Sequence, residues 1–573
     1  RIHPRIRPRP RHEPDVSDDT TDNTAGDATG DASATIDDHS RRRAILARSS
    51  AAVAAGTLLS RLTGLLRVVV LAAAIGKASL ADTYNLANIT PNIVYELLVG
   101  GVLAATLVPV FVDQLERRDD RSTSAVFTVM LTALTLFTAL TMALSPFLAR
   151  LFVLREHGPD RAAQLHVLTV LVLCFVPQMV FYGFTTLASA LLNARRRFVA
   201  AAFAPVLNNV VVIVALLVFA LRTSGRHRAI TDVARIRSDL GLLLLLGIGT
   251  TAGIVAMAGV LVPAVVRAGV LLRFVLAWRD PAIRTILRLS GWTAGYVVTN
   301  QLAQLFVLVL ANNSTGNVSA YVYAFTFYVV PHGLLAVSIM TTMTPNLARL
   351  ARAGDREGMR REFGLGLRYI VVLVLPASVL FAVLAQPMLG VIVRRQFTAH
   401  DAVVTADTLQ AFALSLVPFS VYLYAMRAFY ALQDTRTPFV LNAFENGVNV
   451  VLAIVLFPHL GVQGLALAWS GAYLVAAIGA LVVLRRRIGG VPDATAVRSS
   501  ARAGLAVLAL AAVAAPVAGA LGRSSPAAAF LATAAAATAG TCVYVVGLAV
   551  LRSEELAALV GLVRRRGAAP SGV

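Results

Sequence analysis

The sequence predicts an all-α protein that crosses a membrane about fourteen times. Only 14% of its 573 residues are charged and 57% are hydrophobic, whereas a soluble protein carries about 25% charged residues. The apolar residues occur in blocks of about 18 or more, which is long enough to cross the ~30 Å hydrocarbon core of a bilayer. The arginines gather between these blocks, as expected for the loops of a membrane protein.

Composition also restricts the functions that the chain can have. A net charge of +21 would suggest nucleic-acid binding in a soluble protein, but loop arginines account for it, so no nucleic-acid partner is expected. Cys174 and Cys542 both lie inside apolar blocks and predict neither a disulfide framework nor a metal site. The sequence contains no Gly-rich GK[ST] loop, HExxH motif or Cys/His cluster. We therefore expect no cofactor and no enzymatic activity, and any driving force must come from an ion gradient, the membrane potential or substrate flux.

The chain begins with a polar segment, residues 1–44, that is expected to form a disordered cytoplasmic tail. This segment has few large apolar residues and turns from basic to acidic, a composition that cannot bury a core. No short hydrophobic region with a cleavage site follows it, so it is not a signal peptide. Three arginines at 41–43 stand directly before the first apolar block and favour a cytoplasmic N-terminus.

Fourteen apolar segments are interpreted as membrane spans. An even number of spans returns the C-terminus to the cytoplasm, in agreement with the three arginines at 564–566. In this arrangement the cytoplasmic loops hold about twice as many arginines as the outer loops, although the loop at 222–237 is an exception. The segments are 48–76, 79–112, 123–153, 164–192, 198–221, 240–266, 286–311, 318–347, 366–393, 404–430, 438–458, 462–484, 502–522 and 528–551.

An internal repeat predicts two pseudo-symmetric six-helix lobes. Residues 191–219 resemble residues 429–457, and polar positions match as well as apolar ones. The predicted lobes are 45–275 and 276–490, followed at 491–573 by two extra transmembrane helices and a basic cytoplasmic tail. Parallel repeats of this kind occur in transporters that alternate access between two lobes. Chance similarity between helices rich in Ala, Val and Leu is the alternative.

Two arginines in the first span are candidates for substrate binding. Arg61 and Arg67 lie in the segment SRLTGLLR, and an arginine at the centre of a span costs about 2.5–3.5 kcal/mol. A water-filled cavity that binds an anion such as pyrophosphate would explain both, because the guanidinium fork matches phosphate oxygens. The alternative is a structural ion pair with Asp82 or Glu96. Six residues correspond to about 120° of rotation, so both arginines face one cavity only if it is wide or the helix bends at Gly64.

A polar stripe follows the second span. Asp82, Asn85, Asn88, Asn92 and Glu96 recur at spacings of three or four residues, which places them along one side of a helix. Because polar side chains in a span avoid lipid, the stripe is expected to face protein or a cavity. Asp82, Asn92 and Glu96 then either bind substrate or join helices through interhelical hydrogen bonds.

Two polar residues in the second half are candidates for ion coupling. Glu445 lies in a predicted span with Asn442, Asn446 and Asn449 close by in the sequence. It could hold a proton or a cation, and His332, which follows a proline in the eighth span, could relay protons. Each could equally be a structural group whose hydrogen bonds are satisfied.

These segments resemble a known family. The stretch from Ser60 to Gly101, with its two arginines, its Ala-Asp and its Pro-Asn in that order, is similar to the first two helices of the MurJ (MviN) lipid II flippases. The segments LLNARRRFVAAAFAPVLNN and FYALQDTRTPF are similar to the paired signatures of that family's two lobes. The resemblance runs from about residue 45 to residue 551, and it suggests an actinobacterial-type branch. The family belongs to the multidrug/oligosaccharidyl-lipid/polysaccharide exporter superfamily.

The resemblance implies fourteen helices around a central cavity and a flippase activity. The cargo would be lipid II, an undecaprenyl-pyrophosphate-linked disaccharide pentapeptide, carried from the cytoplasmic to the periplasmic leaflet for peptidoglycan synthesis. By position, Arg61 and Arg67 match the family's cavity arginines and Asp82 matches its helix-two aspartate. Tyr95 and Thr326 stand where the family often has further arginines, which leaves the binding geometry open.

Three other functions are alternatives. They are a flippase for another polyprenyl-linked oligosaccharide, a drug/cation antiporter of the same fold, and a non-transporting scaffold that recruits cell-wall enzymes. Cavity arginines favour an anionic lipid over a cationic drug, because like charges repel, and a scaffold gives no reason for two arginines in mid-helix. The expected partners are thus lipid II or a related undecaprenyl-pyrophosphate-linked glycan, membrane lipids and, alternatively, cell-wall synthesis proteins. The expected location is the bacterial inner membrane, with both termini in the cytoplasm.

Overall fold

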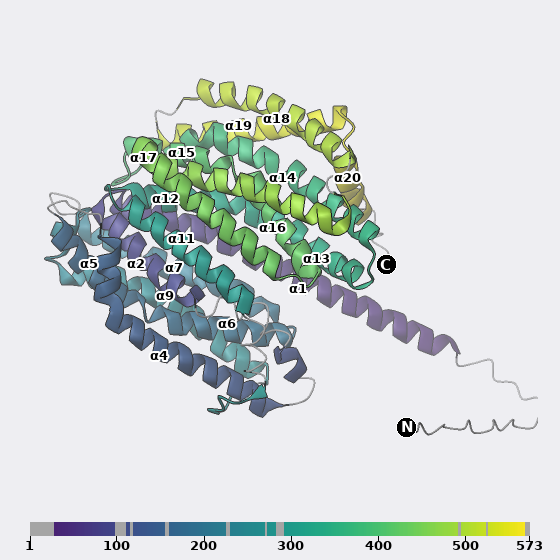
Figure 1. The fold of residues 1–573 in the computed structure, drawn as a ribbon, viewed down its shortest axis with the longest axis horizontal. Coiled ribbons are helices and arrows are strands. Elements are labelled where there is room, and N and C mark those ends of the chain that lie inside the picture. Colours follow the sequence, from purple (N-terminus) through teal and green to yellow (C-terminus); the bar gives the residue numbers. More distant parts are fainter. Residues whose placement is uncertain are drawn as a thin grey trace, which may run out of the picture. The chain divides into compact units, whose positions relative to one another are not determined.

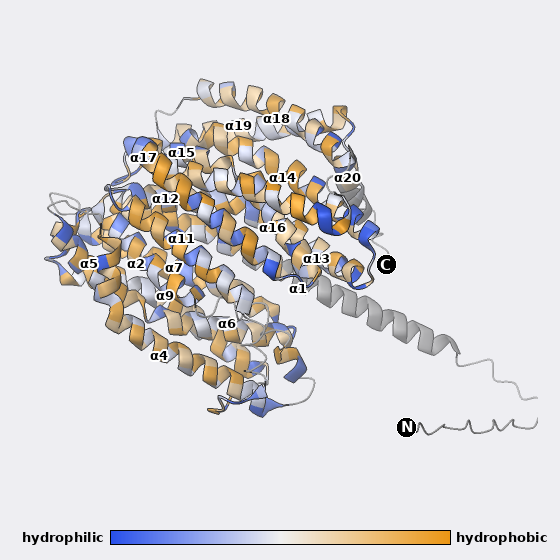
Figure 2. Cartoon of the chain, viewed as in Figure 1, coloured by the Kyte–Doolittle hydropathy of each residue, from blue (hydrophilic) through white to orange (hydrophobic). Residues whose placement is uncertain are grey.

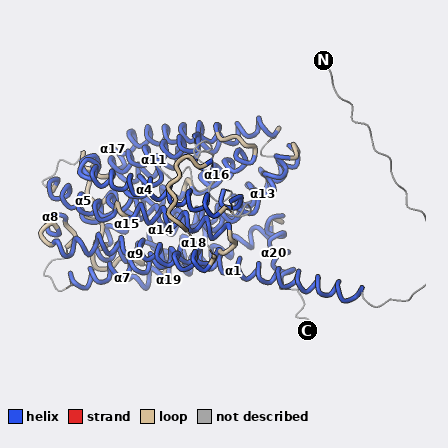
Figure 3. Tube along the Cα trace, turned by 90° about the horizontal axis from the view of Figure 1, so that it is seen from below, coloured by secondary structure: helices blue, strands red, loops and turns tan. Residues whose placement is uncertain are grey.

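The described part of the chain is mostly helical, with turns and one longer loop at 272–280 between the helices (Figure 3). The computed structural model describes residues 28–97, 110–114, 119–154, 160–224, 230–269, 272–281, 283, 291–490, 494–522 and 525–567. No strand occurs among these residues, which confirms the all-α class. Residues 53–573 form one compact unit, and the packing reported below is that of this unit.

Eleven of the described helices are long and apolar enough to cross a membrane, and a bent pair of helices makes a twelfth span. Hydrophobic residues make up most of the cartoon in Figure 2. Many of the large apolar side chains are exposed, among them Leu136, Phe147 and Phe530. A soluble protein would bury these side chains, whereas a bilayer solvates them. The spanning segments are Ala52–Ile75, Asp120–Phe152, Arg161–Ala194, Phe198–Thr223, Leu240–Arg267, Gly291–Ala311, Asn317–Arg352, Arg356–Gly390, Arg436–Ile488, Thr495–Ala520, Pro526–Val550, and the bent pair Ala399–Ala413 with Leu416–Ala431.

The longest helix, α17 (Arg436–Ile488), contains two of the predicted spans. An unbroken helix of this length would be far longer than a bilayer is thick. The backbone breaks at Gly461, where φ is 56° and ψ is −137°, a conformation that favours glycine. The two halves then fold back on each other, because a Cβ atom built on Gly471 would lie 3.0 Å from Leu452.

Helix α2 (Ser79–Tyr95) supplies the first part of the span predicted at 79–112. Residues 98–109 of that prediction lie outside the described residues. Unlike its neighbours, α2 is too short to pass as a span by itself, and most of its side chains are buried by protein. With α2 and the two halves of α17 counted, each of the fourteen predicted spans corresponds to a described helix or part of one.

Helix α1 begins earlier than the sequence suggested. It extends continuously from Ala28 to Ile75, so residues 28–44, expected in a disordered tail, are helical. The composition of this stretch, four alanines among Thr, Ser, Asp and Gly, has weak helix propensity and does not explain the helix, and residues 1–27 lie outside the described residues. The helix also shows no break at Gly64, where a bend was considered. It ends at Gly76, whose φ of 72° is the left-handed conformation typical of helix C-termini.

The described helices pack in two groups and a C-terminal pair. In the first group α2 packs on α5 (Arg161–Phe175) and α6 (Gln178–Ala194), and these contact α4, α7 and α9. In the second group α11 to α16 pack on one another and on α17. Helices α18 (Ala494–Ala520) and α19 pack on each other and on α14 (Figure 1). We call the first two groups lobe 1 and lobe 2. The bounds of the remaining helices are α4 Asp120–Phe152, α7 Phe198–Thr223, α9 Leu240–Arg267, α11 Gly291–Ala311, α12 Asn317–Pro331, α13 Val337–Arg352, α14 Arg356–Gly390, α15 Ala399–Ala413, α16 Leu416–Ala431 and α19 Pro526–Val550.

A similar turn follows α6 in lobe 1 and α16 in lobe 2, close to the start of each copy of the sequence repeat. The turn after α6 contains Arg196 at a φ of 57°, and the turn after α16 contains Gln433 at a φ of 60°. In each turn the following N–H donates to a carbonyl five residues earlier, at 2.8 and 3.0 Å. This left-handed helix cap is common, and the chain also has it after α19, at Arg552 with a φ of 53°.

Candidate functional site

A cavity of about 530 Å³ lies between α2, α11, α12 and α17. This volume is typical of sites for small ligands. The wall combines amide side chains, aromatic rings and one carboxylate, and none of the described residues that line it is an arginine or a lysine. The lining residues are Ile89, Asn92, Glu96, Tyr296, Val297, Asn300, Gln301, Gln304, Val307, Leu308, Tyr321, Val322, Phe325, Thr326, Asn446, Asn449 and Trp469.

The polar stripe on α2 is divided between two environments. Asn92 and Glu96, both predicted to bind substrate, line the cavity. Asn85 lies nearer the start of the helix and donates a hydrogen bond from its side chain to the Ser319 hydroxyl at 3.1 Å. Asn85, Asn92 and Glu96 therefore face protein or the cavity, whose wall also includes Asn446 and Asn449 of α17.

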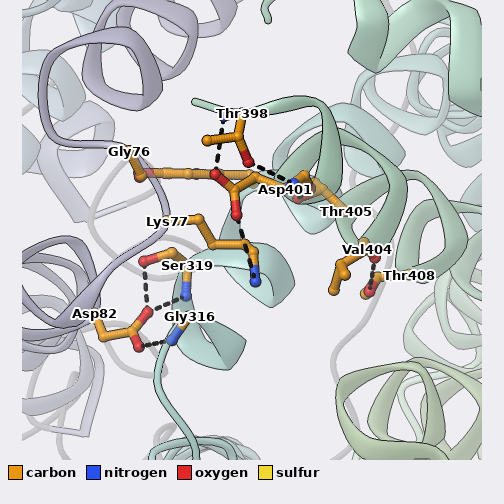
Figure 4. Close-up of polar contacts among 11 residues, drawn as sticks. Gly76, Lys77, Asp82, Gly316, Ser319, Thr398, Asp401, Val404, Thr405 and Thr408 are labelled. Atoms are coloured by element: carbon orange, nitrogen blue, oxygen red, sulfur yellow. Dashed lines mark hydrogen bonds and ion pairs between the residues drawn. The ribbon is translucent and has the colours of Figure 1, made fainter. Parts of the chain in front are cut away.

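Asp82 does not lie in the cavity but joins the two lobes. Its buried carboxylate accepts hydrogen bonds from the N–H groups of Gly316 and Ser319, the latter at 2.8 Å, and from the Ser319 hydroxyl at 2.6 Å (Figure 4). Both N–H groups belong to the first turn of α12, which has unpaired donors and a partial positive charge. Asp82 thus caps a helix of lobe 2 from a helix of lobe 1. We call this contact the Asp82 latch.

Further contacts between the lobes gather at the same end of the bundle, here called the Gly76 end. Lys77, the only lysine of the chain, pairs with Asp401 of α15 at 3.8 Å (Figure 4). The Tyr323 hydroxyl donates to the carbonyl of Gly76 at 3.0 Å. Arg395 donates to the Ala220 carbonyl at 3.1 Å. Lobe 1 and lobe 2 are therefore held together at the Gly76 end.

The two arginines of α1 point to different lobes. Arg61 is exposed and approaches the start of the π-helical turn His332–Ala336, since a Cβ built on Gly333 would lie 3.4 Å from its guanidinium carbon. Arg67 is half-buried and has the phenols of Tyr84 and Tyr182 in lobe 1 as electrostatic neighbours. The two guanidinium groups therefore have different neighbours, in keeping with the rotation of about 120° that six residues make on a helix.

Neither arginine forms an ion pair with an acid among the described residues. The ion pairs found there are made by Lys77 and by other arginines. Asp82, one of the two acids considered as an ion-pair partner, is bound to α12 instead. Helix α1 is fixed by Asn209 of α7, which donates to the Ser60 carbonyl at 3.1 Å and to the Thr63 hydroxyl at 3.0 Å. Asn209 is a positioning residue that spacing in the sequence did not single out.

Glu445 and His332 are both buried, in different surroundings. Glu445 is 1% exposed; its Oε2 accepts from the Asn446 amide at 2.9 Å, while Oε1 has no hydrogen-bond partner in the described part of the chain. His332 has its Nδ1 atom 2.9 Å from the Ser420 hydroxyl and its ring 4.6 Å from that of Phe419. Glu445 is thus incompletely paired beside the cavity, whereas His332 has a partner and lies near Arg61.

Several cavity residues were missed in the sequence. Asn300, Gln301 and Gln304 give α11 a polar face, and its span has the lowest mean hydropathy of the eleven, 1.5. Three amides within five residues of an apolar helix are a signal that could have identified them. The sequence gives no signal that Thr326 or Trp469 lines a cavity, because neither differs from ordinary helix-packing residues.

Comparison with known proteins places the chain in a family. A family model described as lipid II flippase MurJ matches residues 71–533. The chain belongs to the MurJ lipid II flippase family. It is 30% identical over 443 residues to the probable lipid II flippase MurJ of Rhizobium meliloti, covering 75% of this chain and 80% of that protein. It is also 30% identical over 430 residues to the probable lipid II flippase MurJ of Haemophilus influenzae, covering 72% and 81%. The family is one of transporters, as the resemblance implied.

Solved structures agree on the fold. A structure of lipid II flippase MurJ in an inward closed conformation matches with a TM-score of 0.67 and 19% identity, covering 87% of this chain and 99% of that one. An inward-facing multidrug resistance MATE transporter of the MOP superfamily matches with a TM-score of 0.60 and 15% identity, covering 75% and 94%. The two-lobed transporter fold predicted from the sequence repeat is confirmed.

Proposed function

We propose that this protein translocates lipid II from the cytoplasmic to the periplasmic leaflet of a bacterial inner membrane by alternating access. Membership of the MurJ family supports the cargo. In this chain the supporting observation is that Arg61 and Arg67 lie inside the spanning part of α1, Ala52–Ile75. Neither forms an ion pair with an acid among the described residues. A cation in a span is retained where it meets water or an anionic ligand.

The two arginines would act on the pyrophosphate of the cargo. Arg61 is exposed beside lobe 2 and Arg67 is half-buried against lobe 1, so they would meet an anion from two sides rather than as one fork. Charge-assisted hydrogen bonds from guanidinium groups to phosphate oxygens are among the strongest that side chains form. A lipid head group passing along α1 would thus move between Arg61, which faces lobe 2, and Arg67, which faces lobe 1.

The orientation follows from the positive-inside rule. With both termini in the cytoplasm, the clusters at 195–197 and 485–487 lie on the cytoplasmic side and the Gly76 end on the periplasmic side. The Asp82 latch and the Lys77–Asp401 pair then close the periplasmic side. Under this proposal the conformation described above receives its cargo from the cytoplasm. A reporter fused after residue 570 should give a cytoplasmic signal, and a periplasmic signal would contradict the orientation.

Glu445 is proposed to couple transport to a proton or a cation. A carboxylate that is 1% exposed and has one unpaired oxygen would be costly as a free anion. Binding a proton or a small cation neutralises it, and its neighbours Asn446 and Asn449 line the cavity. His332, hydrogen-bonded to Ser420 and close to Arg61, is the weaker candidate, and we assign it to positioning the π-helical turn.

The proposal is tested by replacing the resident flippase of a bacterium with this chain. Expression of the wild-type protein should restore growth to a strain depleted of its lipid II flippase. The Arg61→Ala, Arg67→Ala double variant should reach the membrane at a normal level and fail to restore growth. Rescue by the double variant at a wild-type rate would instead support a scaffold that recruits cell-wall proteins.

A further inference from the structure

We propose that the cavity between α2, α11, α12 and α17 binds the uncharged sugar part of the cargo through its amide side chains and aromatic wall. This inference rests on the proposed function and deepens it, because it separates recognition of the sugar from recognition of the pyrophosphate. The pyrophosphate would be held by the arginines of α1, neither of which lines this cavity.

The polar groups of the wall suit hydroxyl groups rather than an anion. Six amides line the cavity together with one carboxylate, that of Glu96. An amide offers both donors and an acceptor, so it can pair with a sugar hydroxyl, which also does both. A phosphate offers acceptors only and would be repelled by Glu96. The amides are Asn92, Asn300, Gln301, Gln304, Asn446 and Asn449.

The side-chain oxygens of two of these amides lack a hydrogen-bond partner. The side chains of Gln301 and Asn449 are 6% and 3% exposed, and their oxygens Oε1 and Oδ1 have no hydrogen-bond partner among the described residues. Buried polar atoms in proteins are nearly always paired, so an exception indicates a ligand or another functional demand. The two residues lie on α11 and α17, which form neighbouring walls of the cavity. Both oxygens are buried in this conformation, so the amide groups would rotate toward the cavity to accept hydrogen bonds from the hydroxyls of a bound sugar.

An aromatic wall completes the site. Tyr321, Phe325 and Trp469 line the cavity. The Phe325 ring meets the indole of Trp469 edge-on, with centroids 5.3 Å apart. Behind them the buried ring of Phe412 packs against Tyr321 at 5.1 Å and against Phe325 at 5.6 Å. Rings fixed in this way offer rigid apolar area at little entropic cost, suited to the C–H faces of a sugar ring.

The site would also connect the sugar to both lobes. Asn92 and Glu96 belong to α2 of lobe 1, while the unpartnered amides belong to lobe 2. Asp82 lies on the same helix, roughly 15–20 Å from these two residues along the axis. A sugar that bridges α2 and α11 would therefore contact the helix that carries the Asp82 latch.

The test uses the full-length protein in lipid nanodiscs and its own tryptophans. The chain has three tryptophans, and replacing Trp278 and Trp292 by Phe leaves Trp469 as the single reporter. The probe is N,N′-diacetylchitobiose, an uncharged disaccharide with acetamido groups. It should change the Trp469 emission in a saturable way. Inorganic pyrophosphate should leave this emission unchanged.

Matched variants locate the binding. In this background Gln301→Leu and Asn449→Leu should each raise the dissociation constant for the disaccharide at least tenfold. Gln410→Leu is the control, because that amide is bonded to the Ala382 carbonyl outside the cavity and its loss should leave the dissociation constant unchanged. Without ligand, neither cavity variant should melt at a lower temperature than its parent, since neither removes a hydrogen bond made by the amide oxygen. A lower melting temperature for both would show that the amides are structural, which would overturn the proposal.

The remaining outcomes are equally decisive. An unchanged Trp469 emission with disaccharide, or a response that survives Gln301→Leu and Asn449→Leu, would overturn the sugar site. Saturable binding of tetraphenylphosphonium in place of the disaccharide would overturn it in favour of an organic cation held by Glu96. These failures would leave the proposed function standing if Arg61→Ala still abolished lipid II translocation. Disaccharide binding that persists in Arg61→Ala would support two separate subsites.

Discussion

The Asp82 latch gives the sharpest prediction about the transport cycle. In the structure the Asp82 carboxylate receives three hydrogen bonds from the first turn of α12, and these bonds hold the lobes together at the Gly76 end. Substituting Asp82 by alanine removes all three. The N–H groups of Gly316 and Ser319 would then be left without their acceptor as long as that end stays closed.

The size of the effect follows from the three hydrogen bonds that the substitution removes. A hydrogen bond to a charged group contributes about 1.5–3 kcal/mol, and a carboxylate at a helix N-terminus adds about 0.3–1 kcal/mol. Water replaces part of these interactions when the lobes separate, so we expect the closed state to be destabilised by a net amount of about 2–4 kcal/mol. Each 1.4 kcal/mol is a factor of ten. The equilibrium between closed and open Gly76 ends should therefore shift by roughly 30- to 1,000-fold.

Distances between spin labels measure this equilibrium. Ser238 in lobe 1 and Ser314 in lobe 2 are exposed at the Gly76 end and can be labelled as cysteines once Cys174 and Cys542 are replaced. Double electron–electron resonance should show one short distance in the parent protein. In the Asp82→Ala variant a longer distance should dominate.

The control for this experiment lies next to Asp82. Thr83 is also buried in α2, but its hydroxyl bonds to the Ser79 carbonyl within the same helix. Thr83→Val should keep the short distance. A distance distribution in a folded Asp82→Ala protein that equals the parent's would refute the latch, and a shift of similar size in Thr83→Val would show that the effect is not specific to it.

Three further predictions concern the candidate site. Arg61→Lys and Arg67→Lys should each retain part of the lipid II translocation that the alanine variants lose, because lysine keeps the charge without the two-pronged donor; equal loss in lysine and alanine variants would contradict this. Glu445→Gln should lower translocation and remove its dependence on pH and sodium while membrane insertion stays normal, and an unchanged dependence would return Glu445 to a structural role. Gly333→Val should crowd the Arg61 guanidinium, since even a Cβ there lies 3.4 Å from it, and lower translocation at least tenfold; wild-type activity in this variant would show that the approach has no function.

The sequence predicted the spans because their signal is local. Each apolar block of about 18 or more residues must cross the bilayer as a helix whatever the rest of the chain does. Even the two spans inside α17 were separable, since Pro458 and Gly461 interrupt the apolar run. The helical stretch at 28–44 has no such signal, because its residues are mostly polar.

The positions of site residues could be predicted only where they depend on the geometry of a single helix. The spacing of the polar residues predicted that Asn92 and Glu96 face protein or a cavity, and both line the cavity. The same spacing could not show that Asp82 meets Ser319, because that contact depends on how two lobes pack. The divergence of Arg61 and Arg67 was foreseeable from helix geometry, but which lobe each one faces was not.

The measurement that tests the central claim most directly is lipid II translocation by the purified full-length protein. Vesicles that contain the protein and a fluorescent lipid II are treated with a membrane-impermeant quencher, which reports the fraction of lipid II on the outer leaflet. The wild-type protein should move lipid II between leaflets much faster than protein-free vesicles, and the Arg61→Ala, Arg67→Ala double variant should reduce the rate to that background. Translocation by the double variant at the wild-type rate, or none by the wild-type protein, would contradict the account.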